Sequence, residues 1–343
     1  MTKVRLAAYS LIGIRTAEKI ASILREKGME CLCYAPEKYC EGDVLPIKGG
    51  ASRWAEEGFK EADALIFCCA SGIAVRAIAP HVKSKTTDPA VIVTDEMGKF
   101  VIPLLSGHIG GANELASLIA DSLGSIPVVT TATDIHGLFA VDVFATKNHL
   151  KIKSMKLAKD VSAELLNGKE IGFKSDLPIT GELPKGLVKG EAELGILVSK
   201  ENRSPFEKTL RLVPQSYAVG LGCRKDKEGT ELEEFFLRKL SENGVTPDEV
   251  RCIASIDLKK DEAGLIALSK KYKIPFVCFS AEDLLNVEGE FSSSEFVKKT
   301  AGVDCVCERA AKAAMAKEII VKKQAENGMT FALGKFEEVI HFE

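Results

Sequence analysis

The stretch ALIFCCASGIAVRAIAPHVKSKTTDPAVIVTDEMGKFVIPLL (residues 64–105) alternates apolar runs with a helical pattern. The runs ALIFCC, VIVTD and FVIPLL predict strands, and the segment after the first run predicts a helix near residues 72–80. Strand and helix patterns that alternate in this way indicate a sheet covered by helices. EMGK alone separates VIVTD from FVIPLL, which is short enough for a hairpin, so we expect a mixed sheet with an antiparallel pair.

The rest of the first third continues this alternation. VRLAAYSL predicts a strand followed by a helix near residues 15–28, and IPVV predicts a later strand. Between them, SGHIGGANELASLIADSLG predicts a helix that begins near Gly111 and stops at Gly124. From about residue 147 to 214 the chain is richer in Lys, Gly and Pro, which indicates a smaller and looser middle domain.

From Tyr217 onward, strand and helix patterns alternate again. YAVGLG, RCIASID and IPFVCFS predict strands, and helices are expected near residues 230–243, 261–272 and 304–316, with a short one at AEDLL. We therefore predict an α/β fold, in which N-terminal and C-terminal three-layer α/β/α domains with mixed sheets are joined by a smaller middle domain. The expected domains are residues 1–142, 143–214 and 215–343.

Composition excludes several classes of protein. A chain with 46% hydrophobic and 28% charged residues is not disordered. The net charge of -3 provides no positive field, so we expect no nucleic-acid partner. No stretch approaches the roughly 20 apolar residues that cross a bilayer, and the N-terminus lacks an apolar signal core, so we expect no membrane contact and a cytoplasmic protein.

Ten cysteines raise the question of a metal site or of disulfides. Most lie in apolar runs such as LIFCCA and IPFVCF, where a reduced thiol packs like a small hydrophobic side chain. The sequence has no C-x-x-C pair, so the usual ligand spacing of zinc and iron–sulfur sites is missing. We expect reduced structural thiols and no protein-bound metal, with a zinc or iron–sulfur site as the alternative.

Three loops of the first domain, which follow the runs ALIFCC, FVIPLL and IPVV, are small and polar. In open α/β sheets, ligands bind beyond the carboxyl ends of the strands, and glycines let a ligand approach the backbone closely. If the three strands are neighbours, the loops converge on one cleft. The candidate residues of this cleft are Ser71, Gly72, Ser106, Gly107, His108, Gly110, Gly111, Thr131, Thr133 and Asp134.

His108 is the leading catalytic candidate, because its ring exchanges a proton near neutral pH and it lies between glycines at a helix entrance. The alternative is a loop histidine that hydrogen-bonds the backbone. Glu114 is a second catalytic candidate and Asn113 a candidate substrate contact, but either residue can equally cap the helix. Arg76 belongs to a cationic segment that suits a multiply charged anion, although a solvated helix end explains the segment as well.

These stretches together resemble the CbiG family of cobalamin biosynthesis. In the first half the resemblance rests on SGIAVRAIAP (71–80), DPAVIVTDEMG (88–98), PLLSGHIGGANELA (103–116) and TTATDIHGLFAVD (130–142). In the last third it rests on VGLGCRKD (219–226), ASIDLKKDEAGL (254–265), SEFV (294–297), GVDCVCERAA (302–311) and the later VKKQAENGMTFAL. The middle third is similar only loosely. Gly222 and Arg224, in the first of the late motifs, are further candidate substrate contacts.

The resemblance implies an enzyme that acts on cobalt-precorrin-5A, opens its ring-A δ-lactone and releases acetaldehyde to give cobalt-precorrin-5B. It implies no cofactor, because the substrate carries the cobalt. The implied partners are this cobalt-tetrapyrrole substrate and, transiently, other enzymes of the pathway. Backbone N–H groups at the Gly110–Gly111 helix entrance would hold the oxyanion, and His108 or Asp134 would act as the base.

Two other functions use the same features differently. A non-catalytic carrier of cobalt-corrin intermediates would bind cobalt-precorrin-5A in the cleft without releasing acetaldehyde. A nucleotide-dependent oxidoreductase or methyltransferase rests on fold analogy alone. Lys225 stands where a dinucleotide-binding fingerprint needs its third glycine, which argues against that third hypothesis.

Overall fold

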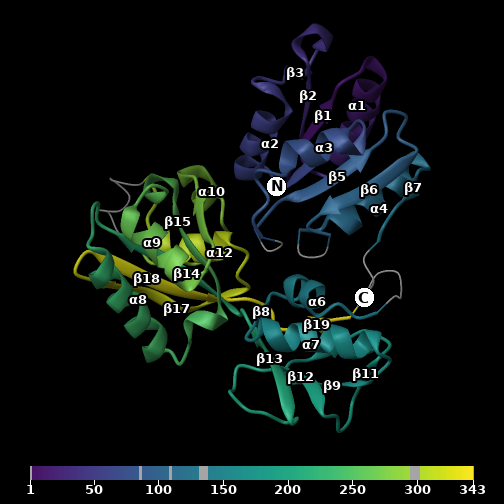
Figure 1. Cartoon of the computed structure of the whole chain (residues 1–343). Helices are drawn as coiled ribbons and strands as arrows, with labels where there is room; N and C mark the ends of the chain where they lie inside the picture. The colour runs from purple at the N-terminus through teal and green to yellow at the C-terminus, as the bar shows by residue number, and fades with distance from the viewer. Residues whose placement is uncertain (1, 85–86, 108–109, 131–137, 294–301, 343) are drawn as a thin grey trace. The chain divides into compact units, whose positions relative to one another are not determined.

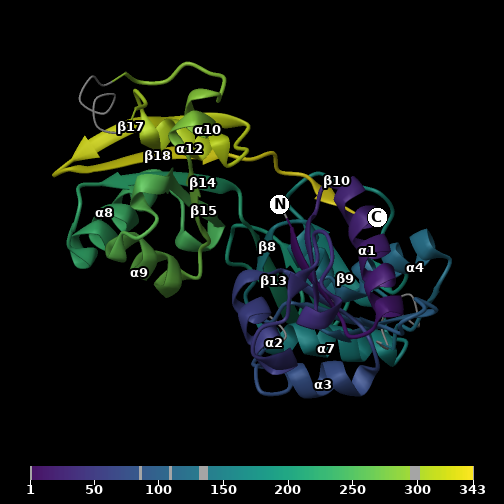
Figure 2. The same cartoon turned by 90° about the horizontal axis from the view of Figure 1, so that it is seen from above.

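The computed structural model describes residues 2–84, 87–107, 110–130, 138–293 and 302–342. The chain forms two compact units, Met1–Val143 and Phe144–Glu343 (Figure 1, Figure 2). The expected α/β fold class is confirmed by sheets that are rich in parallel pairs and covered by helices. The second unit holds two larger sheets, and the expected domain boundary after residue 214 falls between them.

The first unit is built on a seven-stranded sheet in the order β3-β2-β1-β4-β5-β6-β7. Its strands are β1 (Lys3–Ala8), β2 (Glu30–Ala35), β3 (Leu45–Pro46), β4 (Ala64–Cys68), β5 (Ala90–Thr94), β6 (Phe100–Leu105) and β7 (Ile126–Pro127). Its helices are α1 (Leu11–Glu26), α2 (Gly50–Glu61), α3 (Ser71–Ile78) and α4 (Ala112–Leu123), with the short 3-10 helix η1 (Glu37–Tyr39).

Helices cover both faces of this sheet, which gives the first unit three layers. α1 and α4 share one core with Leu6 and Ile66 of the sheet. α2 and α3 cover the other face, where the rings of Trp54 and Phe67 meet edge to face with centroids 5.2 Å apart. Every residue of β4 is buried, because this strand is covered on both faces.

The start of α1 lies closer to β1 than the sequence predicts. The Ser10 hydroxyl accepts a hydrogen bond from the N–H of Gly13 and caps the helix, so α1 begins at Leu11 rather than near residue 15. A Cβ on Gly13 would lie 2.8 Å from the carbonyl oxygen of Cys68, so only glycine lets α1 pack this closely against β4.

β5 and β6 form the expected antiparallel hairpin, in which Thr94 pairs with Val101. Asp95 closes the turn, because its two carboxylate oxygens accept hydrogen bonds from the N–H groups of Met97 and Phe100 at 2.9 and 2.8 Å. β7 is parallel to β6. β6 and β7 therefore run opposite to β1, β4 and β5, and the sheet is mixed as expected.

The second unit has two five-stranded sheets, in the orders β11-β9-β12-β13-β8 and β16-β15-β14-β18-β17, and the pair β10-β19. Its strands are β8 (Leu150–Ile152), β9 (Ile171–Ser175), β10 (Ile179–Thr180), β11 (Leu187–Val188), β12 (Leu194–Val198), β13 (Lys208–Pro214), β14 (Tyr217–Cys223), β15 (Val250–Ile256), β16 (Phe276–Phe279), β17 (Glu318–Glu326), β18 (Met329–Lys335) and β19 (Ile340–His341). Its helices are α7 (Met155–Leu166), α8 (Gly229–Glu242), α9 (Ala263–Tyr272), α10 (Ala281–Leu285) and α12 (Val306–Ala313), with η2 (Pro247–Glu249) and η3 (Asp257–Lys259). α6 (Val141–Lys147) spans the junction of the two units.

The sheet of the last third is also mixed and covered on both faces. α8 and α9 pack on one face around Leu232, Phe235 and Leu265. α10 and α12 pack on the other face around Leu284 and Ala310. β18 is antiparallel to both of its neighbours, β14 and β17.

Two features of the second unit are absent from the sequence-based description. β17 and β18 form a hairpin whose turn residues, Asn327 and Gly328, both have positive φ angles, 48° and 76°. Beyond β18 the chain leaves its own sheet and pairs β19 with β10. Phe342 then stacks on Phe144 with ring centroids 4.9 Å apart, so the end of the chain completes the core of the middle region.

Candidate functional site

The strand ends of the first sheet form two opposite edges, and the carboxyl ends of β4 and β6 lie at different ones. Cys68, at the end of β4, pairs with Thr94, which in turn pairs with Val101 near the start of β6. Leu105, at the end of β6, pairs with Val91 instead. Three residues of strand, about 10 Å, therefore separate the two loops along the sheet. The expectation that the three loops converge on one cleft is wrong, because the hairpin reverses β6 and with it β7.

The edge that contains the carboxyl end of β4 is where open α/β sheets usually bind their ligands. The chain leaves β1 toward β2 on one side and leaves β4 toward β5 on the other, and ligands of open α/β sheets bind at such a switch point. Ser71 and Gly72 lie here, in the first turn of α3, which no side chain caps. Within the described part of the chain, the N–H groups of Ser71 and Gly72 have no backbone or side-chain acceptor.

Arg76 adds a positive charge to the same helix turn. Its guanidinium folds back over the turn, 3.5 Å from the position that a Cβ on Gly72 would take. It is exposed and forms no ion pair with another described residue. Two open N–H groups at a helix N-terminus beside an unpaired guanidinium suit a carboxylate or another anion. Of the predicted site residues, the structure brings Ser71, Gly72 and Arg76 together.

Tyr9, directly after β1, is a residue at this edge that the sequence analysis missed. Its hydroxyl is buried and has no hydrogen-bond partner among the described residues. Burial and the neighbouring Cys69 raise the pKa of Tyr9, so the phenol stays neutral. The next residue, Ser10, donates a hydrogen bond of 2.7 Å to the carboxylate of Glu96. In the sequence, the position of Tyr9 directly after the first predicted strand could have identified it as a candidate site residue.

The described residues of the loop after β6 pack closely on one another and on the start of α4. Ser106 is buried with a φ of 57°, and its hydroxyl donates a hydrogen bond to the carbonyl oxygen of Asp88. A Cβ on Gly107 would lie 2.7 Å from Oδ1 of Asn113, and one on Gly110 would lie 2.4 Å from the Cβ of Ser106. Packing inside the loop therefore accounts for both glycines, and their contact with substrate stays a prediction.

The entrance of α4 is less open to an oxyanion than the sequence predicts. Gly111 precedes the helix with a φ of 77° and provides no side-chain cap. The N–H groups of Ala112 and Asn113 donate to the carbonyl oxygens of Ser106 and Gly107, so two donors of the first turn are already engaged. Asn113 is buried, whereas Glu114 is exposed in the first helical turn, where a carboxylate is favourable.

Asp88 anchors this edge and was not singled out from the sequence. Its side chain is buried, and one carboxylate oxygen accepts hydrogen bonds from the N–H groups of Lys83 and Ser84 at 2.7 and 2.9 Å. Its position directly before a proline and a buried strand is the available signal. The remaining candidates, His108, Thr131, Thr133 and Asp134, lie outside the described residues, and their roles stay predictions.

The C-terminal motifs pack on one another at the carboxyl end of β14. A Cβ on Gly220 would lie 1.8 Å from the carbonyl oxygen of Cys307 in α12, and one on Gly222 would lie 2.6 Å from Oγ1 of Thr330. Arg224 is exposed, and its N–H donates to the carbonyl oxygen of Gly328. Close packing explains the glycine pattern of VGLGCR, so substrate contacts of Gly222 and Arg224 remain predictions.

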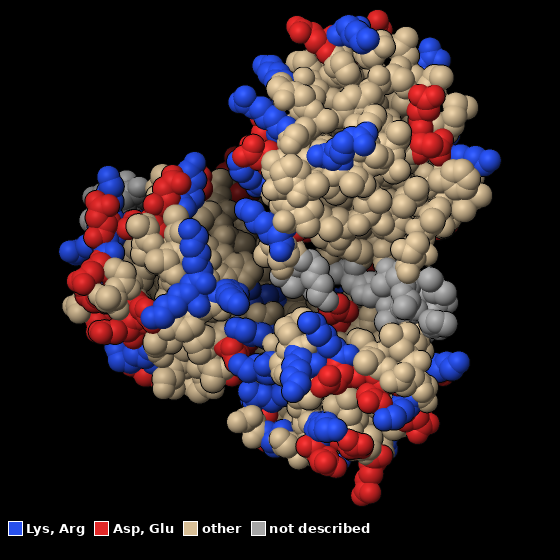
Figure 3. Space-filling view, in the orientation of Figure 1, with Lys and Arg blue, Asp and Glu red and all other residues tan. Residues whose placement is uncertain are grey.

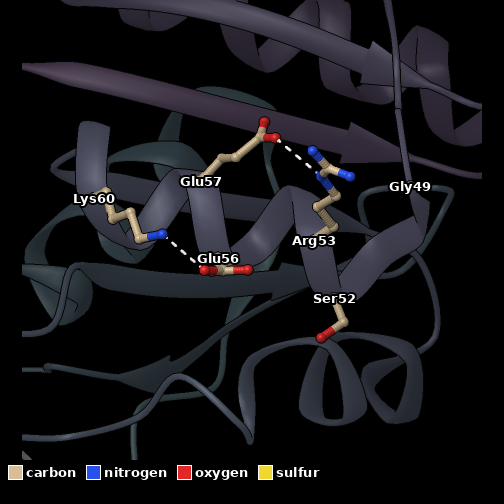
Figure 4. A pocket seen from close by; sticks show the side chains of 6 residues that line it. All are labelled: Gly49, Ser52, Arg53, Glu56, Glu57 and Lys60. Atoms are coloured by element: carbon tan, nitrogen blue, oxygen red, sulfur yellow. Dashed lines mark hydrogen bonds and ion pairs between the residues drawn. The ribbon is translucent and has the colours of Figure 1, made fainter.

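An open pocket of about 590 Å³ lies along α2, lined by Gly49, Ser52, Arg53, Glu56, Glu57 and Lys60 (Figure 4). Its charges pair with each other, Lys60 with Glu56 at 2.7 Å and Arg53 with Glu57 at 3.7 Å, so we assign it no function. The visible face of the first unit around α3 carries few charged side chains (Figure 3). A face with so few charges has little positive potential to attract a polyanion.

The described ranges contain neither a candidate metal site nor a helix that could span a membrane. No group of three or more His, Cys, Asp or Glu side chains there could hold a metal ion. None of the helices described is long and apolar enough to cross a membrane.

Three stretches of the chain match protein-family profiles. Residues 53–134 match "Cobalamin synthesis G N-terminal", residues 139–214 match "Cobalamin biosynthesis central region", and residues 217–334 match "Cobalamin synthesis G C-terminus".

Curated relatives are similar over nearly the whole chain. Cobalt-precorrin-5A hydrolase of Salmonella typhimurium is 36% identical over 336 residues, which cover 94% of this chain and 94% of the relative. Cobalt-precorrin-5A hydrolase of Priestia megaterium is 30% identical over 356 residues, which cover 96% of this chain and 94% of the relative. A solved cobalamin biosynthesis protein G homolog from Sulfolobus solfataricus aligns over 98% of this chain and 97% of that chain, with 22% identity and a TM-score of 0.47.

Proposed function

The chain belongs to the CbiG family of cobalamin biosynthesis, and on this premise we propose that it is a cobalt-precorrin-5A hydrolase. The observation that carries the proposal is the 36% identity with the Salmonella typhimurium enzyme of that name over 94% of both chains. The alignment covers 94% of each chain, which supports the proposal for the chain as a whole rather than for one of its regions.

The proposed reaction has two steps. Water adds to the carbonyl carbon of the ring-A δ-lactone, and the ring C–O bond breaks to leave a carboxylate and a hydroxyl on a two-carbon fragment. The hydroxyl then loses its proton, the bond from this fragment to the macrocycle breaks, and acetaldehyde leaves. The electron pair stays on the macrocycle, where a proton completes cobalt-precorrin-5B. The protein must therefore bind carboxylates, stabilise an oxyanion and move protons.

The α3 entrance supplies the first of these functions. Corrin precursors carry carboxylate side chains around a largely apolar ring. The open N–H groups of Ser71 and Gly72 and the unpaired guanidinium of Arg76 are suited to one such carboxylate, or to the oxyanion itself. The weakly charged face around α3 suits the ring (Figure 3).

The base is proposed from the sequence alone. His108 and Asp134 follow β6 and β7 in the chain and belong to two of the family motifs. We also propose that the cobalt reaches the enzyme only as part of the substrate, that the enzyme works in the cytoplasm, and that other enzymes of the pathway contact it transiently. Its curated relatives are biosynthetic enzymes, which supports the last two proposals.

Acetaldehyde release is the direct test. The purified protein is incubated with cobalt-precorrin-5A while acetaldehyde is trapped and counted against substrate consumed. We expect one acetaldehyde for each cobalt-precorrin-5B formed. Binding of the substrate without acetaldehyde would instead support the carrier hypothesis and refute the hydrolase.

Two variants locate the base. His108→Ala is expected to keep substrate binding and to lose turnover by on the order of a hundredfold, because a positioned general base contributes about that much. Asp134→Asn is the matched variant for the other candidate. Near-normal turnover in His108→Ala would remove His108 from the mechanism, and a large loss in Asp134→Asn alone would transfer the role to Asp134.

A further inference from the structure

Two buried thiols touch at the N-terminus of α12. Cys305 directly precedes the helix, and Cys307 is its second residue. Their sulfur atoms lie 3.9 Å apart, and the two residues are 0% and 1% exposed. The contact follows from the backbone, because Cys305 is extended, with φ -148° and ψ 112°, while Cys307 is already helical. The two side chains therefore turn toward the same point.

Hydrogen bonds to sulfur distinguish the two thiols. The Cys307 thiol bonded to Cys305 lowers the pKa of Cys305, and the backbone N–H of Glu308 acts in the same direction. The bond to Cys305 and burial raise the pKa of Cys307, although the hydroxyl of Thr330 also bonds its sulfur. Cys305 is therefore the thiol of the pair that loses its proton more readily, and Cys307 the one that keeps it.

Close packing holds this pair in place. The carbonyl oxygen of Cys307 lies against Gly220 of β14, so nearby that a Cβ on Gly220 would be 1.8 Å from it. Phe291 packs against the buried cluster that Cys305 and Cys307 form with Ala332. The segment that carries Phe291 is tied to α12, because the carboxylate of Glu308 accepts hydrogen bonds from the N–H and hydroxyl of Ser292 at 3.0 and 2.5 Å.

The chain contains a matched pair that lacks these features. Cys31 and Cys33 have the same spacing and are 4% and 6% exposed, so they are nearly as buried. They lie in the extended strand β2, and no hydrogen bond joins their sulfur atoms. Burial raises the pKa of both, that of Cys33 to about 11. Spacing and burial alone therefore do not join the sulfur atoms of two cysteines by a hydrogen bond.

We propose that Cys305 and Cys307 form a modification site, at which hydrogen peroxide oxidises the two thiols to an intramolecular disulfide. The Cys305 thiolate attacks a peroxide oxygen, the O–O bond breaks, and the hydroxide that leaves takes up a proton to become water. Cys305 is then a sulfenic acid. The Cys307 sulfur attacks the Cys305 sulfur, the S–O bond breaks, and the second hydroxide leaves as water with the proton of Cys307. Two thiols and one peroxide thus give one disulfide and two waters.

Disulfide formation requires the two sulfur atoms to approach each other, from 3.9 Å to about 2.0 Å. Access requires the Phe291 segment to open locally, and the oxidant is a molecule little larger than water. Local openings of this kind cost less than global unfolding.

Mass spectrometry of the full-length reduced protein tests the site. The protein is treated with one equivalent of hydrogen peroxide, quenched with an alkylating reagent and digested with trypsin. We expect the peptide that ends at Arg309 to lose two hydrogens, about 2 Da, with full recovery on reduction. We expect this loss to be at least about tenfold faster than any loss at Cys31 and Cys33, because thiols held protonated react slowly.

Three variants provide the controls. Cys305→Ser and Cys307→Ser should each abolish the 2 Da loss, and Cys305→Ser should also abolish the sulfenic acid that a dimedone probe labels. Cys31→Ser should leave the loss at Cys305 and Cys307 unchanged. Addition of oxygen at Cys305 without a disulfide, or an equally fast loss at Cys31 and Cys33, would overturn the proposal. The wild-type peptide map decides the matter even if a serine variant fails to fold.

Discussion

Gly220→Ala tests whether the glycine pattern of β14 serves packing. The added Cβ would lie 1.8 Å from the carbonyl oxygen of Cys307 and 2.6 Å from its carbonyl carbon, and both are backbone atoms. Ordinary contact begins near 3.4 Å, so β14 and α12 would have to separate by roughly 1.5 Å. Overpacking of a well-packed core costs about 1 to 3 kcal/mol. The cost here belongs at the upper end, because the clash is with the backbone of α12, which cannot rotate aside as a side chain can.

We therefore expect Gly220→Ala to lose about 3 kcal/mol of unfolding free energy, and the second unit to melt about 6 to 12 °C lower. Urea denaturation and differential scanning calorimetry measure the two quantities. Gly190→Ala is the matched control, because nothing lies within 4 Å of a Cβ there. A Gly220→Ala protein within about 0.5 kcal/mol of the wild type would refute the packing argument, and the motif would then need a ligand to explain it.

Three further variants test other parts of the structure. Burial raises the pKa of Asp248, but hydrogen bonds from Lys153 and Lys151 outweigh burial and lower the pKa overall. The Asp248 carboxylate therefore stabilises the fold above the unfolded pKa of about 3.9, and this stabilisation is lost as the pH falls through the folded pKa. Asp248→Asn should therefore be about 1 kcal/mol less stable at pH 6 and equal to the wild type near pH 2 in urea titrations. Phe342→Ala should cost about 3 kcal/mol in the same assay, because Phe342 stacks in the middle core, and an unchanged midpoint would show the tail to be dispensable. Arg76→Ala should raise KM about fivefold with kcat nearly unchanged, because an exposed ion pair is worth about 1 kcal/mol, and a pure loss of kcat would place Arg76 at the reacting atoms instead.

Much of the fold is predictable because its strands carry strong local patterns. ALIFC is apolar throughout because β4 is buried on both faces, and EMGK is a short turn because Asp95 closes it with two backbone hydrogen bonds. The β17–β18 hairpin has an equally clear signal, Asn327 followed by Gly328, which favours a turn with two positive φ angles. That signal lies inside a family motif and was not interpreted as a turn.

Contacts between distant segments are what the sequence could not supply. Gly220 and Cys307 are far apart in the chain, and only the packing of α12 on β14 explains why position 220 is glycine. The same holds for Phe342, whose partners Phe144 and Phe173 lie in the middle region. Single-residue patterns report local conformation, whereas these constraints arise from tertiary contacts.

The reversal of β6 also changes where the oxyanion is best held. The sequence placed it at the entrance of α4, where the N–H groups of Ala112 and Asn113 are engaged by carbonyl oxygens of the preceding loop. The entrance of α3 keeps its N–H groups open and has the Arg76 guanidinium beside it, so it is the stronger electrostatic site. A general base must reach the water that attacks the same carbonyl carbon. At this edge the carboxylate of Glu96 is exposed and bonded only to the hydroxyl of Ser10 among the described residues, whereas both oxygens of Asp95 are occupied by the backbone. Turnover of the two variants thus distinguishes two complete sites. A large loss in His108→Ala or Asp134→Asn assigns the reaction to the β6 edge with α3 as a carboxylate anchor. A small loss in both assigns it to the α3 edge with Glu96 as the base.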